Sequence, residues 1–107
     1  MSVVAIIPAR KGSIRLRNKN RKILGGVPLI NWSINTAKKL KFVDDIIITT
    51  DDKKILNNLK KNKFVKTLFR PVRLAKNDTE MIDVIFHTIK FYEKKFNKIS
   101  TVLLLQP

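Results

Sequence analysis

The segment from Arg10 to Lys22 holds seven basic residues and no acidic residue, and it directly follows an apolar run. Gly12 allows the backbone to turn tightly and to approach a ligand. Ser13 and the amides around it can donate hydrogen bonds to phosphate oxygens, and Arg10 and Lys19 can neutralise the charge of a triphosphate. These residue types predict a cradle for nucleotide phosphates. From the residues alone, a solvated surface loop is an equal alternative.

Two familiar nucleotide-binding motifs are absent from this segment. The sequence contains neither G-x-x-x-x-G-K-[ST] nor G-x-G-x-x-G, so ATPase and dehydrogenase functions lose their main support. The chain has no cysteine, which excludes disulfides and thiolate metal sites. His87 is the one histidine and has no cysteine or nucleophilic serine in view, so no catalytic role is predicted for it.

Three carboxylates stand at positions where strands end or helices begin, namely Asp51, Asp52 and Asp78. Carboxylates at such positions are typical ligands of a divalent cation. Asp is also a preferred residue at a helix N-terminus, where its charge interacts favourably with the helix dipole. We favour capping, and no metal ligand is predicted within the chain.

The elements that must position these side chains are visible as alternating apolar runs and helical periods. Four short runs rich in Val, Ile, Leu or Thr are typical of strands buried on both faces. They are Val3 to Ile7, Asp45 to Thr49, Lys66 to Phe69 and Thr101 to Leu105.

Three segments between these runs follow a 3.6-residue period and are predicted to be helices. They are Leu29 to Leu40, with its stripe Ile30, Ile34 and Ala37; Asp52 to Asn62, with Ile55, Leu56 and Leu59; and Glu80 to Phe96, with Ile82, Ile85, Ile89, Tyr92 and Phe96. Alternating strands and helices predict a Rossmann-like three-layer α/β/α fold with a mainly parallel sheet. Ligands bind at the carboxyl ends of the strands in such sheets, which is where the cradle lies.

The net charge is +15, from 23 Lys and Arg against 8 Asp and Glu. Such a charge attracts nucleic acid, so a basic nucleic-acid-binding module is an alternative function. The chain lacks the interleaved aromatic residues and motifs of such modules, and many of its lysines fall on predicted solvated helix faces. Nucleic acid is therefore not expected as a partner. The apolar run at the N-terminus is too short to be a membrane span, and a cytoplasmic protein without a membrane partner is expected.

Five motifs, in order along the chain, resemble those of the acylneuraminate cytidylyltransferase family, whose members activate acidic nine-carbon sugars. They are A-R-x-G-S-x-x-x-x-x-K-N from Ala9 to Asn20, G-x-P-L-I from Gly26 to Ile30, a match to S-T-D-D over Thr49 to Asp52, R-P-x-x-L-A with D-T from Arg70 to Thr79, and L-L-Q-P from Leu104 to Pro107. Lys11 departs from the family by replacing a second glycine of the loop.

The resemblance implies a reaction in which a sugar hydroxyl attacks the α-phosphorus of CTP, releasing pyrophosphate, with Mg²⁺ as cofactor. By motif position, Arg10 and Lys19 would hold the phosphates and act in catalysis. Ala9, Gly12 and Ser13 would line the nucleotide cradle. Asn20 would hold the nucleoside, Arg70 would contact the cytosine region, and Gln106 would bind the sugar substrate.

The resemblance also implies that residues 1–107 form the N-terminal, nucleotide-binding part of a single cytidylyltransferase domain, truncated at its C-terminal side. The Mg²⁺ ligands and the segment that forms a homodimer in the family would then lie downstream. A fragment of this kind is expected to be inactive alone. A CMP-Kdo synthetase-like enzyme and an inactive truncated remnant remain alternatives.

Overall fold

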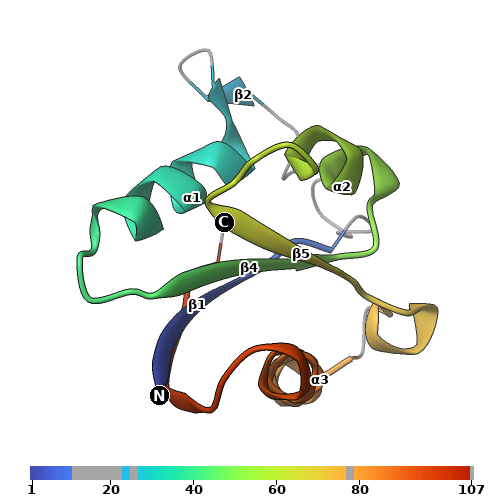
Figure 1. Cartoon of the computed structure of the whole chain (residues 1–107). Helices are drawn as coiled ribbons and strands as arrows, with labels where there is room; N and C mark the ends of the chain where they lie inside the picture. The colour runs from blue at the N-terminus through green and yellow to red at the C-terminus, as the bar shows by residue number, and fades with distance from the viewer. Residues whose placement is uncertain (11–22, 25–26, 77–78, 107) are drawn as a thin grey trace.

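Parallel strands form the centre of the molecule, as the β-branched apolar runs predict. The computed structural model describes residues 1–10, 23–24, 27–76 and 79–106 (Figure 1). Its main sheet has the order β5-β4-β1-β6, and every neighbouring pair is parallel. The strands are β1 (Ser2–Pro8), β4 (Asp45–Thr50), β5 (Val65–Phe69) and β6 (Ile99–Leu104). The predicted α/β fold with a parallel sheet is confirmed.

This strand order contains one reversal of direction. From β1 the chain adds β4 and then β5 on one side, and it returns to place β6 on the other side of β1. In open parallel sheets, ligands bind in the crevice at the carboxyl ends of the two strands that flank such a reversal. The expected position of a ligand is therefore beside the ends of β1 and β6.

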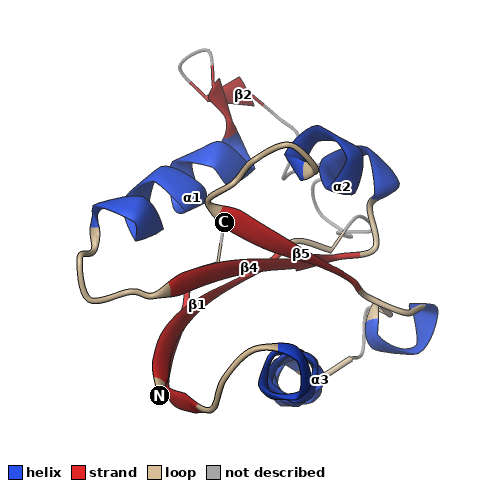
Figure 2. Cartoon of the chain, in the orientation of Figure 1, coloured by secondary structure: helices blue, strands red, loops and turns tan. Residues whose placement is uncertain are grey.

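Helices cover both faces of the sheet (Figure 2). The helices α1 (Leu29–Lys39) and α2 (Lys53–Leu59) lie on one face, and α3 (Met81–Lys95) lies on the other. On the first face, the predicted stripe of Ile30, Ile34 and Ala37 is buried against alternate strand residues, which confirms that helix. The three-layer arrangement follows because each helix buries one apolar stripe against the sheet.

Side chains along each strand alternate between these two faces. Ala5, Ile7, Ile46, Ile48 and Val65 pack with α1 and α2. Val4, Ile6 and Ile47 pack on the opposite face with Tyr92 of α3, and Leu68 of β5 is packed against them. This period of two assigns each residue at a strand end to one face of the sheet.

The predicted buried stripe of α3 is wrong in part. The buried residues are Val84, Thr88 and Tyr92, whereas Ile82 and Phe96 are 47% and 49% exposed. Thr88 can be buried because its hydroxyl donates to the carbonyl oxygen of Val84 at 2.8 Å. Because its hydroxyl is satisfied within its own helix, Thr88 can be part of the core although it is polar.

Burial of all four strands on both faces is also wrong in part. β1 and β4 are almost entirely buried, but β5 and β6 are the outer strands and are partly exposed along their length. Three short elements were not predicted. They are β2 (Ile23–Leu24) and β3 (Val27–Pro28), which pair antiparallel, and the 3₁₀ helix η2 (Val72–Leu74).

Candidate functional site

The predicted site residues divide into two groups. Gly12, Ser13, Lys19 and Asn20 lie outside the described residues. Ala9 and Arg10 directly follow β1, Arg70 directly follows β5, and Gln106 follows β6 by two positions. Because the strands are parallel, all four described residues lie at the carboxyl edge of the sheet. Ala9, Arg10 and Gln106 lie where the strand order reverses, whereas Arg70 lies at the end of the outer strand β5.

The backbone that leads into Arg10 is fastened to the neighbouring strand. The Ala9 amide donates to the Thr49 carbonyl oxygen at 2.9 Å, and the Thr50 hydroxyl donates to the Ala9 carbonyl oxygen. The same hydroxyl accepts from the Asp52 amide at 3.0 Å. These bonds fasten the backbone immediately before Arg10 to the end of β4.

Arg70 is a buried cation at the same edge, with 3% of its surface exposed. Its amide donates to the Thr50 carbonyl oxygen at 2.8 Å, and its Nη2 donates to the Thr49 carbonyl oxygen at 3.2 Å. Burial lowers the pKa of Arg70, with a smaller lowering from the charge of Arg10, and the charge of Asp51 acts in the opposite direction. Arg70 therefore lies within electrostatic reach of both Asp51, whose charge has the larger effect, and Arg10.

The carboxylates near this edge are used in the protein's own structure. Asp52 is the N-cap of α2, and its side chain accepts from the Lys54 amide at 2.9 Å, as the capping interpretation predicts. Asp51 acts electrostatically on Arg70. Within residues 1–10, 23–24, 27–76 and 79–106, no group of three or more His, Cys, Asp or Glu side chains could hold a metal ion. These described residues therefore do not form a magnesium site.

Gln106 is exposed, just beyond the end of β6. The preceding residue, Leu105, donates its amide to the Ile6 carbonyl oxygen at 3.0 Å, which keeps this segment beside β1. The structure therefore brings Gln106 to the same carboxyl edge of the sheet as Arg10. Its predicted contact with a sugar stays a prediction.

Sequence reasoning missed two polar side chains near Arg70. The Oγ1 atom of Thr49 and the Nδ1 atom of His87 are buried, and neither has a hydrogen-bond partner in the part of the chain that the structure describes. The pKa of His87 is lowered by burial first and then by the charges of Arg73 and Arg70. Thr49 belongs to the segment that matches S-T-D-D, but the motif assigned it no role, and His87 stood out only as a single histidine.

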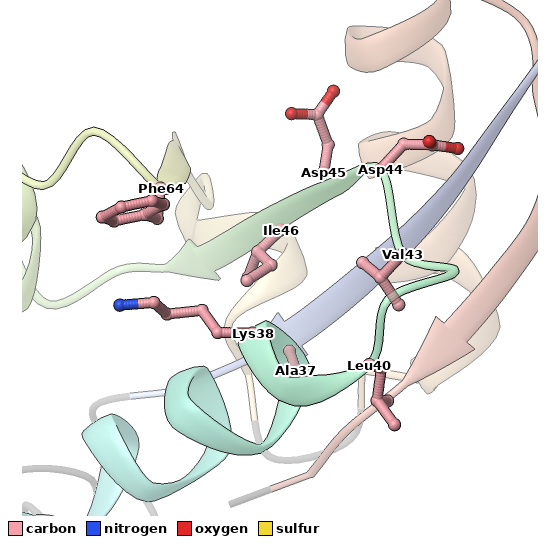
Figure 3. Close-up of a pocket in the computed structure, with 8 residues that line it drawn as sticks. All are labelled: Ala37, Lys38, Leu40, Val43, Asp44, Asp45, Ile46 and Phe64. Atoms are coloured by element: carbon pink, nitrogen blue, oxygen red, sulfur yellow. The ribbon is translucent and has the colours of Figure 1, made fainter.

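A separate hollow of about 200 Å³ lies at the opposite end of β4 (Figure 3). It is lined by Ala37, Lys38, Leu40, Val43, Asp44, Asp45, Ile46 and Phe64. Phe64 lies under the Lys38 ammonium, which is 4.2 Å from the ring centroid. The hollow is formed at the amino end of the strand, so it is distinct from the site at the carboxyl edge.

Among the described residues, no helix is long and apolar enough to cross a membrane.

Comparison with known proteins identifies the family of this chain. The family model described as Cytidylyltransferase matches residues 4–101, which is most of the chain. The chain belongs to the cytidylyltransferase family. The resemblance predicted from the motifs is confirmed at this level.

Two cytidylyltransferase relatives match nearly the whole chain. A CMP-N,N'-diacetyllegionaminic acid synthase of Legionella pneumophila is 32% identical over 107 residues, which cover 100% of this chain and 46% of the relative. An N-acylneuraminate cytidylyltransferase of Escherichia coli O18:K1:H7 is 32% identical over 105 residues, covering 98% of this chain and 24% of the relative. The chain thus spans less than half the length of these relatives.

Two further similarities involve an eight-carbon sugar acid. A 3-deoxy-manno-octulosonate cytidylyltransferase of Bdellovibrio bacteriovorus is 45% identical over 51 residues, covering 48% of this chain and 21% of the relative. The solved structure of a CMP:2-keto-3-deoxy-manno-octonic acid synthetase complexed with CTP aligns with a TM-score of 0.71 and 23% identity. It covers 99% of this chain and 40% of that one. The structural similarity supports the nucleotidyltransferase fold.

Proposed function

We propose that this chain is the nucleotide-binding part of a cytidylyltransferase that forms a CMP-sugar from CTP and an acidic sugar. The observation that carries the proposal is the convergence of Arg10 and the buried Arg70 at the carboxyl edge of the sheet. That edge is where open parallel sheets bind nucleotides, and the strand order reverses there. Family membership supports CTP as the nucleotide.

In the proposed reaction, a sugar hydroxyl oxygen forms a bond to the α-phosphorus of CTP. The bond from that phosphorus to the bridging oxygen breaks, pyrophosphate leaves with the electron pair, and the hydroxyl proton passes to solvent. Such reactions depend mainly on positioning and on stabilising charge. Arg10 and Lys19 would neutralise the triphosphate and the leaving pyrophosphate. Arg70 would fix the nucleoside, and Gln106 the sugar.

An acidic nine-carbon sugar is the leading substrate class. The similarity to the legionaminic and acylneuraminic acid enzymes covers 100% and 98% of the chain, whereas the similarity to the eight-carbon enzyme of B. bacteriovorus covers 48%. The latter is higher in identity, so a CMP-Kdo synthetase is the second candidate. In either case we propose that residues 1–107 are one part of a single catalytic domain in a cytoplasmic homodimer, with the Mg²⁺ ligands elsewhere in that domain.

The proposal predicts that removing either arginine weakens CTP binding. A hydrogen bond in which one partner is charged contributes about 1.5 to 3 kcal/mol, so Arg10→Ala and Arg70→Ala should each raise the Kd for CTP by at least about tenfold. Isothermal titration calorimetry on the purified chain measures this effect. Lys94→Ala is the matched control, because it removes one positive charge from the exposed last turn of α3. Equal losses in all three variants would indicate a general effect of charge and would contradict the proposed site.

A further inference from the structure

Three buried side-chain polar atoms have no hydrogen-bond partner among the described residues. They are Oγ1 of Thr49, Nε of Arg70 and Nδ1 of His87. Thr49 is fully buried, and Arg70 is 3% exposed. A buried polar atom without a partner costs about 1 to 3 kcal/mol, so a group that satisfies more than one of these atoms would stabilise the fold.

The three side chains converge on one face of the sheet. Ile47 and Leu68 both belong to the cluster beneath α3, and Thr49 and Arg70 follow them by two positions, which places both on the α3 face. Arg70 and Thr49 are in contact, since Nη2 of Arg70 donates to the Thr49 carbonyl oxygen at 3.2 Å. His87 belongs to α3 itself, immediately before the buried Thr88, and the charge of Arg70 acts on it.

The hydrogen-bonding capacities of these atoms are complementary. Arg70 Nε can only donate, a neutral imidazole can accept at Nδ1, and the Thr49 hydroxyl can do both. Burial and the charges of Arg73 and Arg70 lower the pKa of His87, which favours the neutral imidazole at physiological pH. One water molecule could satisfy all three, because buried waters make about three hydrogen bonds.

We propose that Thr49 and His87 are positioning residues that hold the Arg70 guanidinium in place through one shared, water-mediated bridge. The water accepts from Arg70 Nε, donates to His87 Nδ1 and bonds to the Thr49 hydroxyl. With Nη2 held by the Thr49 carbonyl oxygen, the bridge fixes the plane of the guanidinium. This inference rests on the proposed function, in which Arg70 contacts the nucleotide.

Two matched pairs of variants test the bridge by its effect on CTP binding. His87→Leu removes the acceptor, whereas His87→Asn keeps an oxygen near the position of Nδ1. Thr49→Val replaces the hydroxyl with a methyl group of similar size, whereas Thr49→Ser keeps the hydroxyl. Loss of one hydrogen bond that orients Arg70 should raise the Kd for CTP about 3- to 10-fold in the Leu and Val variants. The Asn and Ser variants should remain within about twofold of the wild type.

The Arg70→Ala background separates positioning from general destabilisation. If His87 acts through Arg70, His87→Leu has no further effect on the Kd once Arg70 is alanine. An equal loss in both backgrounds overturns the inference and leaves the proposed function standing. A wild-type Kd in Arg70→Ala contradicts the proposal that Arg70 contacts the nucleotide. It also contradicts the inference that the bridge positions Arg70 for that contact.

The bridge itself is tested without nucleotide by nitrogen-15 NMR of the imidazole. The inference predicts a single neutral tautomer of His87 at pH 7.5, with the proton on Nε2 and an unprotonated Nδ1. It also predicts an Arg70 Nε proton protected from solvent exchange in the wild type and exposed in the Leu variant. A His87 that carries its proton on Nδ1 overturns the bridge whatever the binding data show.

Discussion

At the scale of single residues, the types and spacing in the sequence predict two cations of the proposed site but not the side chains proposed to position them. Arg10 and Arg70 were predicted as nucleotide contacts, and both lie at the carboxyl edge of the sheet. Thr49 could not be predicted, because its importance comes from a strand register that places it beside Arg70. His87 lies in none of the five motifs. Only the packing of α3 onto the sheet brings it near the arginines.

Asp52 tests the distinction between capping and metal binding at this scale. Asp52→Ala should lower the free energy of unfolding by about 1 kcal/mol or more, because the α2 N-terminus loses its cap. Asp52→Asn should stay close to the wild type, since Asn caps equally well. Urea denaturation with and without Mg²⁺ measures both effects. A Mg²⁺-dependent stability that both substitutions abolish would contradict the capping role.

The lowered pKa of His87 predicts a dependence of stability on pH. The unfolded chain takes up a proton at His87 near pH 6.5, while the folded chain resists protonation to lower pH. The stabilisation is therefore complete above pH 6.5 and is lost as the pH falls through the lower pKa of the folded state. Urea denaturation between pH 7.5 and 5 should show this loss in the wild type and a shallower slope in His87→Asn. Identical slopes would contradict the lowered pKa.

At the scale of elements, the spacing of apolar residues predicts the main helices and strands, but it does not predict the buried face of every helix. The stripe of α1 was predicted correctly because its apolar residues stand on one side only. In α3, apolar residues occur around much of the helix, and Thr88 was passed over as polar although it is buried. The β2 and β3 hairpin was missed even though Gly25 and Gly26 stand between two apolar pairs, a known hairpin signal.

The observed buried face of α3 predicts a large loss of stability for one substitution by alanine and a small loss for another. Val84 is 2% exposed and Phe86 is 59% exposed, although phenylalanine is the larger side chain. Val84→Ala should therefore lower the free energy of unfolding by about 1.5 kcal/mol, from about 0.8 kcal/mol per buried methyl-sized group. Phe86→Ala should change it by less than about 0.5 kcal/mol. Chemical denaturation of the two variants checks the register, and a larger loss for Phe86→Ala would contradict it.

At the scale of the whole molecule, the alternation of strands and helices predicted a parallel three-layer sheet but not its strand order. The order β5-β4-β1-β6 depends on long-range pairing, and it is this order that places the reversal beside Arg10 and Gln106. The net charge of +15 acts at the same scale. It raises the affinity for any polyanion, so binding of phosphate alone cannot separate a nucleotide site from a nucleic-acid surface.

The most direct test of the central claim is the nucleotide preference of the chain. Calorimetry with Mg²⁺ at two salt concentrations would compare CTP with ATP, GTP and UTP, with a random oligonucleotide as competitor. CTP should bind at least about tenfold more tightly than the other three nucleotides, which corresponds to about 1.4 kcal/mol. The preference should persist at the higher salt concentration. Equal affinity for all four nucleotides, together with strong and salt-sensitive oligonucleotide binding, would contradict the cytidylyltransferase function. That result would favour a nucleic-acid-binding module.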